Sequence, residues 1–143
     1  MDHEAFHERM SAMKLSTLLT VYSATALVIC LDFLIVPGFW ITLYGATADL
    51  QATFLYRLIG ALFGGLAVMA WRARAMESKG TGGAMVEGLI IMNALLTLVA
   101  VLGALTGVYN RFAWGPVGMF GLFTFGFARV ATSRVRGMAS PTA

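Results

Sequence analysis

The chain has 143 residues, of which 59% are hydrophobic and only 12% are charged. A soluble domain usually carries about a quarter charged residues, so this composition excludes an ordinary water-exposed fold. The net charge of +3 comes from basic residues between apolar runs, which favours contact with anionic lipid headgroups and excludes nucleic acid as the expected partner. The length fits a single transmembrane domain over residues 1–143.

The first predicted element is a short amphipathic helix over residues 1–14, with apolar residues at helical spacing and acidic residues in its first turn. We expect it to lie on the membrane surface or on a partner protein. His3 and His7 would share one face of this helix, but two imidazoles without a cysteine make an incomplete metal site. No metal is predicted.

Four apolar segments follow, and each approaches or reaches the roughly 20 residues that a helix needs to cross the hydrocarbon core. They cover residues 15–36, 54–71, 88–108 and 112–128. Between the first two, residues 37–44 could form a short interfacial helix or an extended loop. Residues 130–143 are expected to be a cytoplasmic tail. The pattern predicts an all-α integral membrane four-helix bundle.

The distribution of Lys and Arg predicts the orientation of this bundle. Most basic residues fall before the first span, between the second and third, and after the fourth, which places these segments on one side. The opposite side has Arg111, Arg57 just inside the second span, and most of the Trp and Tyr residues near span ends. We therefore expect both termini in the cytoplasm of a bacterium, with the chain in the inner membrane.

Small residues are expected to bring the helices together, because apolar side chains gain little by leaving lipid for one another. Glycines occur at four-residue spacing in the second and third spans, and the fourth span is rich in them. The predicted packing positions are Gly60, Gly64, Gly103, Gly107 and Gly118.

Charged residues within the spans should be paired, since each is costly in the membrane. Asp32 and Arg57 lie at matching depths in the first two spans, which predicts an ion pair between these helices. An ion, proton or headgroup site at this position is the alternative. Glu87 and Arg129 could form a second pair at the cytoplasmic interface, or both could extend to headgroups and water.

The sequence contains no pattern that indicates a catalytic site. No histidine lies in a span to hold a haem, and no Ser or Cys has a plausible base at the same depth, so we predict no catalytic residue and no enzyme. Asn93 is the most notable polar residue at mid-depth. It could donate an interhelical hydrogen bond or contact a substrate.

Several short motifs carry a family resemblance: Pro37, Tyr44-Gly45, and Arg57-Leu58-Ile59-Gly60-Ala61. With these the chain resembles small four-helix bacterial membrane proteins of the DoxX-like kind and related families of unknown function. The resemblance implies a compact four-helix bundle. Some DoxX-like proteins are associated with thiol or quinone redox systems, but Cys30 alone cannot supply a dithiol.

The function predicted from the sequence is that of a non-catalytic accessory or structural subunit of a larger membrane complex. Its ten Phe and nine Met would give adaptable apolar faces for partner helices. Membrane lipids and other membrane subunits are the expected partners. No covalent cofactor is expected, although lipid, quinone, carotenoid or pigment could bind at the surface. The alternative is a small-solute transporter or a carrier of a hydrophobic ligand such as a quinone or lipid.

Overall fold

The computed structural model describes residues 3–77, 83–107 and 110–138, and side chains over 15–76, 83–107 and 110–132. All regular structure in these ranges is helical. The elements are α1 (His3–Ile35), α2 (Pro37–Leu43), α3 (Leu50–Glu77), α4 (Gly83–Leu105), the short 3₁₀ helix η1 (Arg111–Ala113) and α5 (Trp114–Met138).

Helix α1 joins the predicted surface helix and the first predicted span into one continuous helix. No Gly or Pro interrupts residues 3–35, so nothing in this stretch breaks the hydrogen-bond ladder. Pro37 then begins α2, the short helix that was one of the two structures expected for residues 37–44. Gly45, with a φ of +85°, turns the chain after α2.

The other long helices extend beyond the predicted apolar cores. Asp49 caps α3, since its Oδ1 accepts a hydrogen bond of 2.7 Å from the backbone nitrogen of Ala52. Helix α3 therefore begins at Leu50, and it continues to Glu77. Helix α5 runs to Met138, through much of the segment predicted as a tail. Helical structure continues where side chains become polar, because a helix does not end at the edge of an apolar run.

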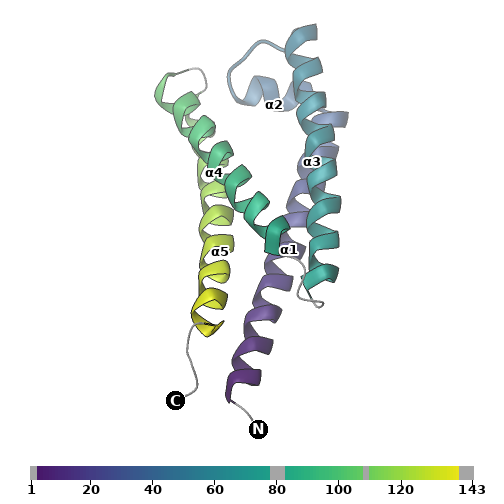
Figure 1. The fold of residues 1–143 in the computed structure, drawn as a ribbon. Coiled ribbons are helices and arrows are strands. Elements are labelled where there is room, and N and C mark those ends of the chain that lie inside the picture. Colours follow the sequence, from purple (N-terminus) through teal and green to yellow (C-terminus); the bar gives the residue numbers. More distant parts are fainter. Residues whose placement is uncertain (1–2, 78–82, 108–109, 139–143) are drawn as a thin grey trace.

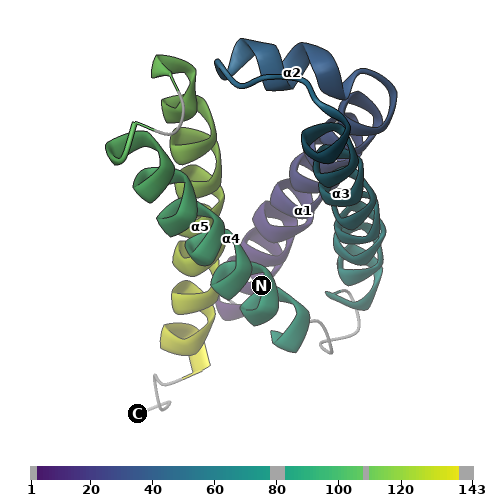
Figure 2. The ribbon, with the colours of Figure 1, turned by 90° about the horizontal axis from the view of Figure 1, so that it is seen from above.

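The helices form two antiparallel pairs, α1 with α3 and α4 with α5 (Figure 1). The two chain termini lie at the same end of the molecule, and we call this the closed end. The pairs meet there and diverge toward the other end, which carries α2 and η1 and which we call the open end (Figures 1 and 2).

Three of the helices are long and apolar enough to cross a membrane. The stretches are Leu15–Ile35, Leu50–Met76 and Gly83–Leu105. The fourth predicted span falls within α5, which is not among them, because its glycines, Pro116 and Arg129 lower its hydropathy. This length and composition indicate a membrane protein.

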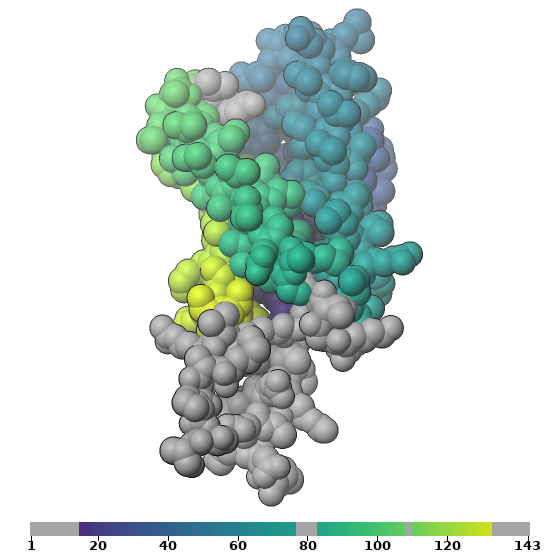
Figure 3. All heavy atoms as spheres, viewed as in Figure 1, coloured from purple at the N-terminus to yellow at the C-terminus, as the bar shows by residue number. Residues whose placement is uncertain are grey.

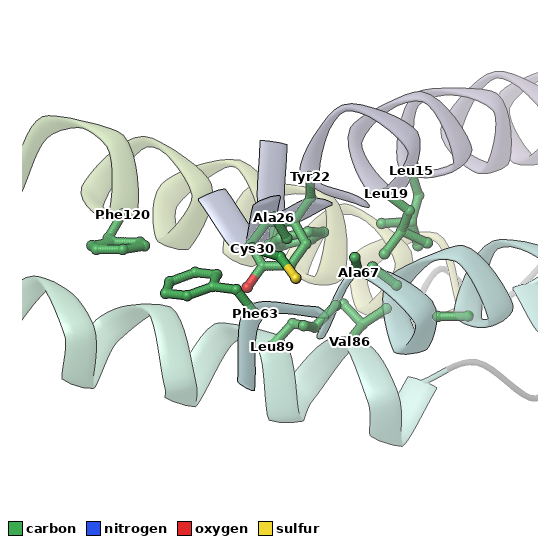
Figure 4. Packing of buried hydrophobic residues seen from close by; sticks show 13 residues of the cluster. Leu15, Leu19, Tyr22, Ala26, Cys30, Phe63, Ala67, Val86, Leu89 and Phe120 are labelled. Carbon is green, nitrogen blue, oxygen red and sulfur yellow. The ribbon is translucent and has the colours of Figure 1, made fainter. Parts of the chain in front are cut away.

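The buried core lies toward the closed end and draws on all four long helices (Figure 4). Leu19 and Tyr22 of α1 and Phe127 of α5 are almost completely buried. The Tyr22 ring packs edge-on against Phe123 and Phe127, with ring centroids 4.8 Å and 5.5 Å away. These large side chains join the two helix pairs at this end.

Candidate functional site: a cleft between the helix pairs

A cleft of about 780 Å³ opens where the two helix pairs diverge. Seen from above, α2 lies beside the space that separates α1 and α3 from α4 and α5 (Figure 2). The space-filling view shows α4 lying close to α3 in its first turns, while the later turns of α4 lie farther away (Figure 3). Every element from α1 to α5 contributes side chains to the walls.

On α3, α4 and α5 the cleft residues lie toward the open end and the core residues toward the closed end, whereas on α1 the two sets overlap over residues 24–30. On α5, for example, Pro116 and Met119 line the cleft, whereas Phe127, farther along the helix, is in the core. On α4, the order reverses with the chain direction, so that Leu89 is in the core and Val99 lines the cleft. The cleft therefore begins where the core ends.

Phe63 of α3 and Phe120 of α5 form the boundary between core and cleft. Both belong to the buried core and both line the cleft. Their rings are stacked with centroids 6.0 Å apart and an interplanar angle of 18°, and they face each other across the gap between the helix pairs (Figure 4). This aromatic contact closes the floor of the cleft.

Asn110 links the two sides of the cleft at the open end. Its Nδ2 donates a hydrogen bond of 2.7 Å to the carbonyl oxygen of Leu43, and its backbone nitrogen donates one of 3.1 Å to Tyr44. Its Oδ1 also accepts from the nitrogen of Phe112, which caps η1. One side chain thus ties the end of α2 to the turn before α5.

The walls of the cleft are mostly aliphatic and aromatic, and Asp32 is the one charged residue among the side chains that line it. Asp32 lies on α1, one turn before the helix ends, and is partly buried. Thr25, one of the few other polar side chains in the lining, donates its hydroxyl to the carbonyl oxygen of Val21 and so is satisfied within α1. The carboxylate is the dominant polar feature of the cleft.

Aromatic rings cluster at the open end, in the lining of the same cleft as Asp32. Phe33 lies 5.0 Å from Tyr56 and 6.0 Å from Trp40, measured between ring centroids, and Trp40 lies 6.3 Å from Tyr44. All four rings line the cleft, and we call them the aromatic cluster. They come from α1, from α2 with the residue that follows it, and from α3.

Asn93, predicted as a polar site, is completely buried in the core below the cleft and does not line it. Its Nδ2 donates to the carbonyl oxygen of Leu89, 2.8 Å away in the same helix. Its side chain lies against the Tyr22 hydroxyl. Neither that hydroxyl nor Asn93 Oδ1 has a partner with hydrogen-bond geometry among the described residues, so this contact joins α1 and α4 without a well-formed hydrogen bond.

The structure does not bring Asp32 and Arg57 together as an ion pair within the described side chains. Gly60 of α3 packs against Phe33, Cys30 and Leu34 of α1. At about 100° per residue, Asp32 lies roughly 150° from the mean direction of these three contacts. Arg57 is exposed on α3. The predicted partners therefore have matching depths, but Asp32 is on the face of α1 directed away from α3.

Other polar contacts join α1 to α3 instead. The Ser23 hydroxyl donates a hydrogen bond of 2.8 Å to the carbonyl oxygen of Ala67. Arg74 Nη1 donates to the Thr20 hydroxyl at 3.2 Å, and its guanidinium lies 3.8 Å from the centroid of the Trp71 ring. Serine and threonine are too common in membrane helices for sequence alone to have selected these positions.

Glu87 and Arg129 are both exposed, and they form no ion pair in the part of the chain whose side chains are described. The Arg129 guanidinium lies 5.8 Å from the centroid of the Phe125 ring on its own helix. Glu87 lies in the second turn of α4, whereas Arg129 lies nine residues before the end of α5.

The predicted packing glycines have different surroundings. A Cβ at Gly60 would lie 2.9 Å from Phe33 Cβ, and one at Gly64 would lie 3.0 Å from Cys30 Sγ, so both are at the contact of α3 with α1. Gly118 has open space around it. Gly107, with a φ of +69°, lies in the turn after α4, and Gly103 is half-buried within that helix.

Comparison with known proteins identifies a family. Residues 3–131 match the family DUF8292, described as a domain of unknown function. No curated protein and no solved structure matches the chain. The resemblance to DoxX-like proteins stays a prediction. Because the match covers nearly the whole chain, including the cleft and the core, the protein belongs to the DUF8292 family.

Proposed function

We propose that this chain is a membrane protein that binds a hydrophobic or amphiphilic molecule in the cleft between its helix pairs. One observation carries the proposal, namely a cleft of about 780 Å³ with walls that are almost entirely apolar or aromatic. Ligand pockets in proteins have volumes of about 300–1,000 Å³ and this kind of lining. Quinones and lipid-like molecules belong to the class that fits. The proposed role is binding or carriage rather than catalysis.

The proposal includes a topology in which α1, α3, α4 and α5 all cross a bacterial inner membrane, with both termini in the cytoplasm. Its support is the antiparallel pairing of α4 with α5 and the position of both termini at the closed end. Arg72 and Arg74 near the end of α3 are at that end, whereas Trp40 in α2 is at the other. The cleft would then open toward the outer leaflet.

The accessory-subunit function predicted from the sequence has weaker support. Large apolar side chains such as Leu62 and Val68 are exposed along α3, and partner helices could cover them. Lipid tails would cover the same surface equally well. The cleft favours the binding function over the accessory-subunit function. Helices that only contact lipid tails or partner helices do not need to diverge around a cleft.

Blocking the cleft tests the proposal. Ala100 lines the cleft on α4, whereas Ala94 is exposed on the same helix and does not line it. We expect Ala100→Phe to weaken binding of a neutral short-chain quinone by about tenfold or more, because the ring occupies the ligand's space. Ala94→Phe makes the same change of volume outside the cleft and should leave binding unchanged.

Tryptophan fluorescence provides the measurement, since quinones quench it and Trp40 lines the cleft. The chain has three tryptophans, so a background carrying Trp71→Phe and Trp114→Phe leaves Trp40 as the only reporter. Titrations are made in lipid nanodiscs. Equal quenching in the parent, Ala100→Phe and Ala94→Phe proteins would mean that the quinone reaches Trp40 from bulk lipid, and the proposed function would be wrong.

A further inference from the structure

We propose that the cleft selects hydrophobic organic cations, with the positive group held at Asp32 and the apolar body deeper in the cleft. This inference rests on the proposed binding function and adds the charge class of the ligand. Its basis is the juxtaposition of one carboxylate, a cluster of aromatic rings and an otherwise apolar wall.

The first step is the charge of the cleft. Asp32 is in the lining, and the described residues of the lining include no Lys, Arg or His. Among the described side chains, none forms an ion pair with Asp32, and the predicted partner Arg57 is exposed on the neighbouring helix. Arg111, at the open end, lies over the Phe112 ring, 5.7 Å from its centroid. The cleft therefore presents a negative group without a counter-charge from its own walls.

The second step is the cost of that arrangement. An ionised carboxylate surrounded by apolar side chains and lipid is unfavourable unless a positive charge lies beside it. A bound cation would offset this cost, whereas a neutral ligand would leave it in place and an anion would increase it. The electrostatic preference of the cleft is thus cation over neutral molecule over anion.

The third step is the aromatic cluster. Phe33 directly follows Asp32 in the chain, and its ring lies within 6.0 Å of Trp40 and 5.0 Å of Tyr56. Aromatic faces attract organic cations, and they do so more strongly where water is excluded. Carboxylate and rings together form a recognition site at the open end, because both favour the same charge on the ligand.

The rest of the cleft defines the ligand's body. Val28 and Ile29 of α1 and Met119 of α5 line the space between the aromatic cluster and the Phe63–Phe120 floor. These side chains offer contact to an alkyl or aromatic body but no charged group. A zwitterionic lipid headgroup would bring a phosphate, for which the described lining offers no basic side chain. We therefore assign the site to a molecule with a positive charge only.

Two probes of matched size and opposite charge test this assignment, tetraphenylphosphonium and tetraphenylborate. Binding is measured by Trp40 fluorescence in nanodiscs, in the background lacking the other tryptophans, with partition into protein-free nanodiscs subtracted. We expect the parent protein to bind the cation at least about tenfold more tightly than the anion, as charge-assisted contacts commonly give. Equal binding of the two probes would overturn the inference.

Three variants test whether Asp32 causes the preference for the cation over the anion. Asp32→Asn keeps the size of the side chain and should reduce the preference to within about twofold, since it removes the charge. Asp32→Glu should retain the preference. Glu87→Gln removes one negative charge from an exposed position outside the cleft and should also retain it. A preference that survives Asp32→Asn would contradict the assignment.

The failure of this inference differs from failure of the proposed function. If Ala100→Phe blocks the neutral quinone but the parent protein shows no cation preference, the cleft binds ligands and the charge class is wrong. If Ala100→Phe alters binding of neither the quinone nor tetraphenylphosphonium, the cleft is not the binding site and both proposals are wrong.

Discussion

The closed and open ends of this molecule are built from the same four helices but packed in different ways. At the closed end, Tyr22 and Phe127 fill the space between the helix pairs and are almost completely buried. At the open end, α1 and α3 remain in contact around Gly60, while α4 and α5 diverge from them. Large side chains fill the space between the pairs at one end, whereas at the other end the pairs diverge and the large side chains line a cleft.

This difference teaches how a small membrane protein can combine a rigid base with a binding space. In lipid the hydrophobic effect does not drive helices together, so close packing has to do so. The closed end has that packing between the pairs, whereas the open end has it only within them. Among the described residues, Asn110 links the pairs at the open end through its polar contacts with Leu43 and Tyr44. The closed end therefore stabilises the contact between the pairs, and the open end gives a ligand access to the cleft.

The largest expected effect is at the closed end. Phe127→Ala should lower the free energy of unfolding by about 3 kcal/mol, at the low end of the range for Phe→Ala in protein cores, because lipid reduces the transfer contribution but not the cavity contribution. Thermal unfolding in detergent measures the change. Phe125→Ala is the matched control on the same helix, where the side chain is 63% exposed, and it should have little effect. Equal losses in both variants would contradict the assignment of the core.

The second largest effect on the free energy of unfolding is expected at the contact between α1 and α3. Gly60→Ala would place a Cβ 2.9 Å from Phe33 Cβ and 3.2 Å from the Cys30 carbonyl oxygen, so backbone has to move. Overpacking costs about 1–3 kcal/mol, which exceeds the gain of up to about 1 kcal/mol from replacing glycine in a helix. We expect a net loss of about 1 kcal/mol. A rise in the thermal midpoint would show that α1 and α3 are not in close contact there.

Gly65→Ala is the control for this substitution. Gly65 lies in the same helix, is exposed, and has nothing within 4 Å of an added Cβ. The substitution should therefore be neutral or stabilising, since only the helix propensity changes. Opposite signs for the two glycines would show that packing, and not propensity, decides the outcome at Gly60.

These positions also show how much the sequence could predict. The spacing of Gly60 and Gly64 indicated a close helix contact, and both lie at the contact with α1. The approximate positions of the long helices followed from the apolar segments, although α1, α3 and α5 extend beyond them. Each of these signals is local, because it depends on residues within one or two turns.

The cleft could not be predicted in this way. Asp32 and Arg57 were paired by their matching depths, but the rotation of α1 directs Asp32 away from α3. Rotation and divergence of helices depend on side-chain packing across the whole bundle, for which one sequence contains no direct pattern. The contact of Asn110 with Leu43 spans 67 residues and likewise has no local signal. The cleft thus depends on the rotation and divergence of helices and on contacts between residues far apart in the chain. The periodicity of the sequence does not specify these features.

The smallest expected effect on the free energy of unfolding is at Asn110, whose side chain links the two helix pairs at the open end. Asn110→Ala removes the 2.7 Å bond to the Leu43 carbonyl and the cap of η1, at a cost of about 0.5 kcal/mol because the site is exposed. Hydrogen exchange should increase at the amides of Gly45 and Ala46, which follow α2, while amides of the core remain protected. Thr106→Ala at the same end removes a hydroxyl that bonds only within its own helix, so it should leave exchange at Gly45 unchanged. If Asn110→Ala also left that exchange unchanged, α2 would be held over the cleft by its own packing, and the two ends would differ less in their rigidity than the contacts indicate.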